Sequence, residues 1–295
     1  MTRNPALLPL LATIIGIGFF SAMDAVMKSA ALAIGAYSAY FLRCAIGVSF
    51  AMPIWALTNL RWPAREVLRI HIIRGVVAAF MGLSFFYAIV RLPLAEAIAL
   101  SFIAPLIALY LAAILLGETI ERKAIIAAIL GLLGVIIIVG GKIGLERMTE
   151  DAALGLAALF LSAVLYAWNL ILQRQQALVA SPIEVSVFQN GIAGSVLLIG
   201  TPFLLVIPQD QSVWIDLIVG AVLTILAVLF LSWAYARAEA QVLVPVEYTG
   251  FLWAALFGWL MFDERVTIAT AAGAVLIVIG CWIATRQTPP EQTAV

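Results

Sequence analysis

Charged residues are scarce in this chain. They make up 11% of its 295 residues, whereas a soluble domain typically has about 25%. Hydrophobic residues make up 65%, and the mean hydropathy is +1.14. A water-facing fold cannot bury so much apolar surface, so we expect an integral membrane protein in contact with lipid. The formal net charge is zero, which argues against a nucleic-acid partner.

Histidine and cysteine are also rare, with one histidine and two cysteines. The chain has no His-Glu-x-x-His motif, no Gly-x-x-x-x-Gly-Lys loop and no Cys or His cluster for a metal ion. We therefore expect neither an enzyme nor a cofactor. Cys44 and Cys281 lie in apolar runs and are expected to be free buried thiols, and His71 is expected at the membrane interface. No cleavable signal peptide is evident, because the first apolar run leads straight into further runs.

Apolar runs of about 20 residues, the length of a transmembrane helix, recur along the chain. Short connections separate them, so we expect an all-α membrane protein without a soluble domain. Ser181-Pro-Ile-Glu184 predicts a capping box at the start of the seventh run. We count ten runs, at about 7–28, 36–58, 67–89, 94–116, 123–141, 153–173, 183–206, 213–236, 241–262 and 267–285.

The chain contains a long internal repeat. A shift of 146 residues places the stretch 87–118 on 233–264 without a gap. The shift aligns charged residues of the two stretches, Arg91 with Arg237 and Glu118 with Glu264. It also aligns a small residue at every fourth position, which places one small stripe on one helix face and lets two helices pack closely in lipid. The stripe consists of Ala104, Ala108 and Ala112 in the first copy and of Gly250, Ala254 and Gly258 in the second.

Five runs per copy is an odd number, so the second copy must be inverted in the membrane relative to the first. Inverted repeats are characteristic of transporters, in which each of two near-equivalent faces opens in turn. We expect a first repeat at 1–145, a second at 146–286 and a disordered cytoplasmic tail at 287–295.

Lysine and arginine predict the orientation. With a cytoplasmic N-terminus, ten of them lie at the inner face and five at the outer face, while Arg43 lies within a run. We therefore expect both termini in the cytoplasm. The inner group is Arg3, Arg61, Arg65, Arg69, Arg74, Arg122, Lys123, Arg174, Arg237 and Arg286, and the outer group is Lys28, Arg91, Lys142, Arg147 and Arg265.

The stretch 87–141 resembles an EamA repeat of the drug/metabolite transporter superfamily. The resemblance rests on the Ala-rich fourth run with Pro105, on Gly117-Glu118 after it and on Gly131 to Gly134 in the fifth. The second copy departs from the pattern, with Asp263 in place of Gly117 and Phe251 in place of Pro105. The resemblance implies ten helices in two inverted halves around a substrate cavity. Within the family, the chain is most similar to YddG-type exporters of aromatic and other amino acids.

Carboxylates within apolar runs are costly in lipid and usually have a partner or a task. Asp24 either pairs with Lys28 four residues later or lies in the cavity, where it binds an amino group or carries a proton. Glu96 either stabilises the first turn of its helix, where the helix dipole favours a carboxylate, or couples transport to proton movement. Glu247 aligns with Ser101, so the repeat does not require it, and it is either a proton carrier or a partner of an arginine.

Arg43 either attracts a substrate carboxylate or ties the second helix to a neighbour. Amides within the membrane need hydrogen-bond partners, so we expect them to face other helices or a wet cavity. Next to aromatic side chains they would suit a zwitterion with an apolar side chain. The substrate-binding candidates are Asp24, Arg43, Trp168, Asn169, Gln189 and Tyr248, and the proton-coupling candidates are Asp24, Glu247 and Glu96.

Together these features predict a secondary transporter of a bacterial inner membrane that exports small metabolites, most simply amino acids. Its partners would be the substrate and membrane lipids, in a monomer or homodimer. Transport would be driven either by proton antiport or, in facilitated diffusion, by the concentration gradient of the substrate. A sugar-phosphate or nucleotide-sugar exchanger would need a strongly cationic cavity, for which Arg43, Lys28 and Arg74 are the candidates. A cationic drug exporter is a further alternative, and an intramembrane enzyme would need a convergent catalytic group that the sequence does not show.

Overall fold

The computed structural model describes residues 7–59, 62–104, 107, 122–145, 149–238, 243, 246 and 249–285. Within these residues all regular secondary structure is helical. The helices are α1 (Leu7–Ile34), α2 (Ala36–Asn59), α3 (Arg65–Ile89), α4 (Leu94–Ser101), α6 (Arg122–Leu145), α7 (Glu150–Val179), α8 (Pro182–Leu198), α9 (Thr201–Leu204), α10 (Gln211–Tyr235), α12 (Gly250–Phe262) and α13 (Ile268–Thr285).

Five described helices, α1, α2, α3, α7 and α10, are long and apolar enough to cross a membrane. Shorter apolar helices lie at Ile129–Ile138, Gly250–Phe262 and Ile268–Gly280. Many large apolar side chains on the outer surface are exposed, among them Leu57, Phe203 and Ile268. Apolar exposure on this scale fits a surface that faces lipid rather than water. Parts of the predicted fourth and ninth runs, and the predicted tail, lie outside the described residues, so the number ten stays a prediction.

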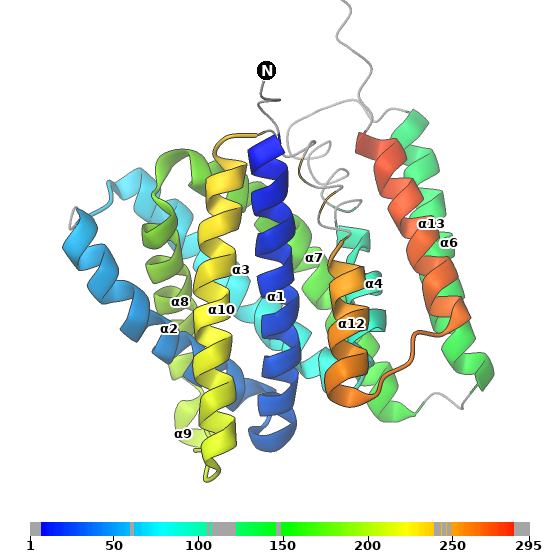
Figure 1. The fold of residues 1–295 in the computed structure, drawn as a ribbon, viewed down its shortest axis with the longest axis horizontal. Helices are drawn as coiled ribbons and strands as arrows, with labels where there is room; N and C mark the ends of the chain where they lie inside the picture. Colours follow the sequence, from blue (N-terminus) through cyan, green and yellow to red (C-terminus); the bar gives the residue numbers. More distant parts are fainter. Residues whose placement is uncertain are drawn as a thin grey trace, which may run out of the picture.

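The helix boundaries follow the 146-residue register of the sequence repeat. Shifted by this amount, α3 falls on α10 at both ends. The starts of α2 and α6 fall likewise on the starts of α8 and α13. In Figure 1, α1 runs downward from the N-terminus, whereas its counterpart α7 starts at the bottom and runs upward. The two copies are therefore inverted relative to each other.

Helix contacts obey the same two-fold relation. Two equivalent pairs pack on each other, α2 on α8 and α6 on α13, and α4 of the predicted fourth run packs on α12 of its counterpart, the predicted ninth run. The remaining large contacts are exchanged between the copies, because α1 packs on α10 and α3 on α7. The two copies thus interdigitate and share one core, so the predicted repeats at 1–145 and 146–286 are not two separate domains in space.

Two arginines repeat one contact in both copies. Arg91 donates from NH1 to the Tyr87 carbonyl oxygen at 3.1 Å, and its guanidinium lies 3.6 Å from the centre of the Tyr87 ring. Arg237 donates in the same way to Trp233 at 3.1 Å and lies 4.2 Å from its ring. Each arginine is thereby anchored at its helix end by a cation–π contact.

Small residues allow close contacts between helices in several places. Gly250, Ala254 and Gly258 are the buried residues of α12, and Ala104 is fully buried. Their predicted partners Ala108 and Ala112 lie outside the described residues. The closest approach joins α6 and α13, where a Cβ on Gly134 would lie 2.6 Å from the Gly273 carbonyl oxygen and a Cβ on Gly273 equally close to that of Gly134. Only glycine fits this reciprocal contact.

Local turns fix the positions of two acidic side chains, Glu184 and Glu264. The Ser181 hydroxyl accepts the Glu184 N–H at 3.4 Å and caps α8, as the predicted capping box requires. The Glu184 carboxylate, however, contacts His71 on α3. At the end of α12, Asp263 adopts a left-handed conformation with φ of 52°. This turn directs Glu264 back toward the start of α4, where its Oε2 accepts the Leu94 N–H at 2.7 Å.

Candidate functional site

A cavity of about 210 Å³ lies at the centre of the bundle. Side chains from both copies line it, contributed by α1, α2, α3, α4, α7, α8, α10 and α12. Apolar walls include the rings of Phe20, Phe85, Phe86 and Phe102. The polar lining residues are Ser21, Asp24, Tyr40, Arg43, Arg74, Ser101, Ser162, Tyr166, Asn169, Gln173, Gln189 and Thr224. A largely apolar cavity with a few placed polar groups is the usual form of a small-molecule site.

Asp24 lines this cavity from α1. The predicted ion pair with Lys28 does not form, because Lys28 pairs with Glu264 instead. That alternative for Asp24 was wrong: although one helical turn separates the two residues, their side chains have different surroundings. Arg43 is the cation whose charge acts on Asp24, and no described residue accepts or donates a hydrogen bond at its carboxylate. The cavity thus contains a carboxylate available to a ligand.

Arg43 lines the cavity from α2, with 6% of its surface exposed. Its NH1 donates to the Thr224 hydroxyl at 2.6 Å, and its guanidinium lies 5.0 Å from the centre of the Tyr40 ring. Its buried Nε has no hydrogen-bond partner among the described residues. Its counterpart in the second copy, Gln189, also lines the cavity and has a buried Oε1 without a described partner. Two equivalent positions of the repeat thus offer one donor and one acceptor.

Arg74 provides a second cation in the cavity wall. Its three guanidinium nitrogens each donate to an amide oxygen of α7: Nε to Asn169 at 3.1 Å, NH2 to Gln173 at 3.2 Å and NH1 to Gln176. No carboxylate among the described residues forms an ion pair with Arg74 or Arg43. Neutral acceptors hold the guanidinium in place without neutralising it, so its charge remains available to an anionic group.

His71 lies one helical turn before Arg74 and is fully buried, not interfacial as predicted. Its Nε2 lies 3.0 Å from Glu184 Oε1, and its ring stacks on Phe188 with the two ring centres 4.5 Å apart. Its Nδ1 contacts the Gln176 amide nitrogen. Polar partners on α7 and α8 form hydrogen bonds with this histidine inside the bundle. Its position next to a basic loop in the sequence had suggested a contact with lipid headgroups instead.

The other predicted site residues have different outcomes. Asn169 and Gln189 lie in the cavity lining with Asp24 and Arg43. Trp168 is 44% exposed and is absent from the lining, so its ring faces outward from α7. Glu96 is half-buried in the first turn of α4 and is also absent from the lining. Glu247 and Tyr248 lie outside the described residues, as does the side chain of Cys281, while Cys44 is a buried free thiol as expected.

Sequence reasoning gave too little weight to one helix face. Asn169, Gln173 and Gln176 are spaced four and three residues apart, which places all three on one side of α7. A run of amides on one side of a membrane helix requires a polar partner. Arg74 is that partner, whereas the sequence analysis placed it in the inner-face group and named it as a cation for a sugar-phosphate exchanger. The spacing of the three amides could have identified the site.

A largely buried ion pair joins the two copies at the end of the bundle where α3 meets α4. Lys28 pairs with Glu264 and donates to the Leu92 carbonyl oxygen at 2.9 Å. The pair joins α1 and the α3–α4 connection of the first copy to the α12–α13 turn of the second. At the other end of the bundle Arg174, the counterpart of Lys28, donates to the carbonyl oxygen of Ala238, the counterpart of Leu92, at 3.1 Å. The contact is thus part of the repeat.

Two inverted copies of a helical unit around a shared cavity with a few polar groups define a membrane transporter. The chain belongs to the EamA-like transporter family, which matches residues 7–140 and 153–286 and therefore both copies. This family is part of the drug/metabolite transporter superfamily, whose members are transporters and not enzymes. The two matched stretches account for the internal repeat.

Individual relatives extend over most of the chain. The pseudopaline exporter CntI of Pseudomonas aeruginosa is 29% identical over 265 residues, which cover 89% of this chain and 90% of that protein. An uncharacterized transporter of Helicobacter pylori is 32% identical over 212 residues, covering 70% of this chain and 69% of that protein. A chain of known crystal structure superposes with a TM-score of 0.65 at 19% identity over 94% of this chain and 96% of that one. That likeness concerns the fold alone.

Proposed function

We propose that this transporter exports small zwitterionic metabolites, most simply amino acids, from the cytoplasm across the inner membrane. One observation carries the proposal: a single cavity between the two copies contains the Asp24 carboxylate together with the Arg43 and Arg74 guanidinium groups. A carboxylate binds an ammonium group, and a guanidinium binds a carboxylate through parallel hydrogen bonds. A zwitterion supplies both partners at once. The rings of Phe85 and Phe102 in the lining suit an apolar side chain.

The inverted architecture supports alternating access as the mechanism. The pairs α1–α10 and α3–α7 each join one helix of either copy and are exchanged by the two-fold relation, so the two sides of the bundle can move against each other and expose the cavity at either face in turn. Lys28 and Glu264 join the two copies at one end of the bundle, and we propose that this contact keeps that end closed. The direction of transport is proposed from the pseudopaline exporter, which is named for export.

The charges of the cavity rank the alternatives. Two guanidinium groups and one carboxylate in the described lining give a surplus of one positive charge, which disfavours a cationic drug. A sugar phosphate would match the two arginines but would bring its own negative charge close to Asp24, at a cost in a largely apolar cavity. An amino acid avoids both conflicts.

Competition for flux into proteoliposomes tests the proposal. Unlabelled amino acids are expected to compete with a labelled amino acid, whereas sugar phosphates and quaternary ammonium compounds are not. The reverse ranking would overturn the proposal.

An Asp24→Asn variant tests the ammonium contact within the same assay. Loss of one hydrogen bond to a charged group is expected to weaken amino-acid binding by about tenfold or more. Glu96→Gln is the matched control, since it makes the same chemical change outside the cavity lining, and it is expected to leave binding unchanged. Equal effects of the two variants would contradict the assignment of Asp24.

A further inference from the structure

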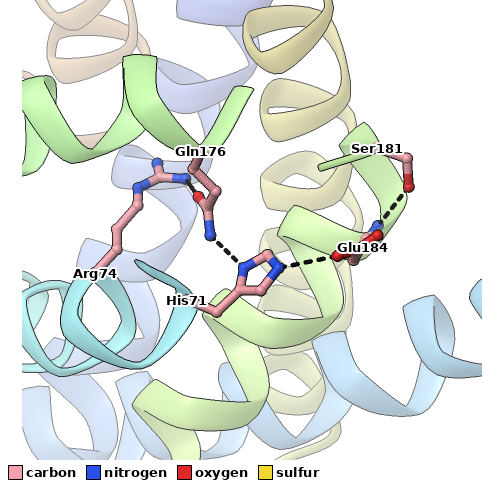
Figure 2. A network of polar contacts seen from close by, with 5 residues as sticks. All are labelled: His71, Arg74, Gln176, Ser181 and Glu184. Atoms are coloured by element: carbon pink, nitrogen blue, oxygen red, sulfur yellow. Dashed lines mark hydrogen bonds and ion pairs between the residues drawn. The ribbon is translucent and has the colours of Figure 1, made fainter. Parts of the chain in front are cut away.

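A network of polar contacts leads from the cavity to the start of α8, and Figure 2 shows it from Arg74 through Gln176 and His71 to Glu184. Three helices contribute: α3 carries the arginine and the histidine, α7 the glutamine and α8 the glutamate. The four side chains lie away from solvent, with 4% of Arg74, 1% of Gln176, none of His71 and 9% of Glu184 exposed. Buried hydrogen bonds of this kind restrict which atoms donate and which accept.

The donor and acceptor roles follow from the two ends of this network, Arg74 and Glu184. Arginine has only donors, so Gln176 must turn its oxygen toward Arg74. The amide nitrogen of Gln176 then faces His71 Nδ1 as a donor, and Nδ1 must accept. A carboxylate only accepts, so His71 Nε2 carries the proton that Glu184 Oε1 receives at 3.0 Å. The network therefore assigns a neutral His71 with its proton on Nε2.

A second proton on His71 is incompatible with this arrangement. Both ring nitrogens of an imidazolium are donors, so Nδ1 would face the amide nitrogen of Gln176, another donor. If the amide turned over to accept from His71, its nitrogen would face the guanidinium of Arg74, which again has only donors. In either orientation of the Gln176 amide, one hydrogen bond of the network is lost.

Two charged groups face His71 among the described residues. Glu184 on α8 favours the imidazolium, and Arg74 on α3 disfavours it. From α7 the facing group is the neutral Gln176, and above the ring lies the apolar Phe188 of α8. Burial of the ring, Glu184 and Arg74 together therefore set the charge of His71. Through Gln176, the position of Arg74 depends on that charge.

We propose that His71 is a positioning residue which, through Gln176, holds Arg74 in the geometry that binds the substrate carboxylate. Protonation of His71 turns the Gln176 amide, releases one of the three contacts that fix the guanidinium and so weakens substrate binding. The inference rests on the proposed function, because that function makes Arg74 a carboxylate site. It adds a pH-sensitive control of this site from the end of the bundle where Glu184 lies.

The first experiment reads the tautomer and needs no substrate. The chain has a single histidine, so ¹⁵N-histidine labelling of the full chain, purified without a polyhistidine tag, yields signals from His71 alone. At pH 7.5 the spectrum is expected to show a neutral ring protonated at Nε2. A ring protonated at Nδ1, or an imidazolium, would overturn the proposal whether or not amino acids are transported.

The second experiment measures amino-acid flux in proteoliposomes between about pH 5 and pH 8, the range in which imidazole changes its charge. The pH is equal on both sides, so that no proton gradient drives transport. Loss of one hydrogen bond to a charged group predicts about a tenfold fall in apparent substrate affinity toward low pH.

Two glutamates at matched positions separate this control from a general effect of charge. In Gln176→Glu the carboxylate accepts from Arg74 and from a protonated His71 alike, so the pH dependence of affinity is expected to disappear. Gln173→Glu places the same charge beside Arg74 without touching the link to His71, and its affinity is expected to keep the pH dependence of the wild type. A Gln176→Glu profile that matches the wild type, or a Gln173→Glu profile that is equally flat, would overturn the proposal. If the wild type transports no amino acid at all, the proposed function fails, and the tautomer measurement still decides the role of His71.

Discussion

The Lys28–Glu264 ion pair is expected to control how often the predicted outer face of the transporter opens. Only 6% of the Lys28 side chain and 17% of the Glu264 side chain are exposed. In Glu264→Gln the amide oxygen still accepts the Leu94 N–H, but the negative charge that neutralises Lys28 is lost. Removal of one partner of a buried ion pair typically costs about 3–5 kcal/mol, and the retained acceptor favours the lower end of this range.

This cost applies to the arrangement in which the two copies are joined at that face. Once this end opens, Lys28 becomes hydrated and no longer needs its partner. About 3 kcal/mol therefore favours the open arrangement by roughly 100-fold. The variant is expected to expose the cavity to the outside more often without loss of the fold.

Cysteine labelling measures this opening. The native cysteines are replaced by alanine, Ser101→Cys provides a thiol in the cavity lining, and a membrane-impermeant reagent is added from outside. Glu264→Gln is expected to raise the labelling rate by up to roughly 100-fold. Asp151→Asn is the matched control, because it removes a surface ion pair with Arg91 in which Asp151 is 77% exposed, and such pairs contribute little. A labelling rate that Glu264→Gln leaves at the wild-type value would refute the reasoning.

Three further outcomes are expected. Gly82→Ala would place its Cβ 2.6 Å from the Tyr40 hydroxyl and is expected to destabilise the fold by about 1–3 kcal/mol, measured as a lower melting temperature in detergent. Gly140→Ala is the control: its Cβ would meet nothing within 4 Å, so the melting temperature is expected to stay unchanged. Trp168→Ala is expected to leave substrate affinity in a binding assay unchanged, since the ring faces outward; a loss of affinity would return this residue to the site. If Glu247 carries protons, Glu247→Gln is expected to abolish the dependence of flux on a pH gradient in proteoliposomes, and an unchanged dependence would exclude it.

The sequence predicted the helical repeat well because lipid imposes strong rules on every residue. An apolar run of a given length can only be a helix in the membrane, and the positions of Arg91 and Arg237 fix the register between the copies. The same cation–π contact at both arginines bears out this register. The inversion followed from the odd number of runs, without any knowledge of tertiary contacts.

The site was less predictable because partners lie far apart in sequence. Asp24 and Lys28 are separated by a single turn, and a local rule paired them, but Lys28 reaches a residue 236 positions away. His71 is adjacent to a basic loop, but three helices enclose it. Such contacts depend on how α3, α7 and α8 pack. The periodicity of a sequence predicts which side of a helix faces inward, but it does not predict which helix packs against that side. Trp168 was wrongly predicted to line the cavity for this reason. Its neighbour Asn169 lies on the cavity side of α7, and a shift of one position turns Trp168 outward.

The central claim is that one cavity binds the ammonium group and the carboxylate of the same molecule. Equilibrium binding of phenylalanine, phenethylamine and 3-phenylpropionate to the purified protein tests it directly, because the two analogues each lack one of these groups. Phenylalanine is expected to bind at least about tenfold more tightly than either analogue, since each missing group removes a hydrogen bond to a charged side chain. Equal affinity for phenylalanine and one of the analogues would contradict the account.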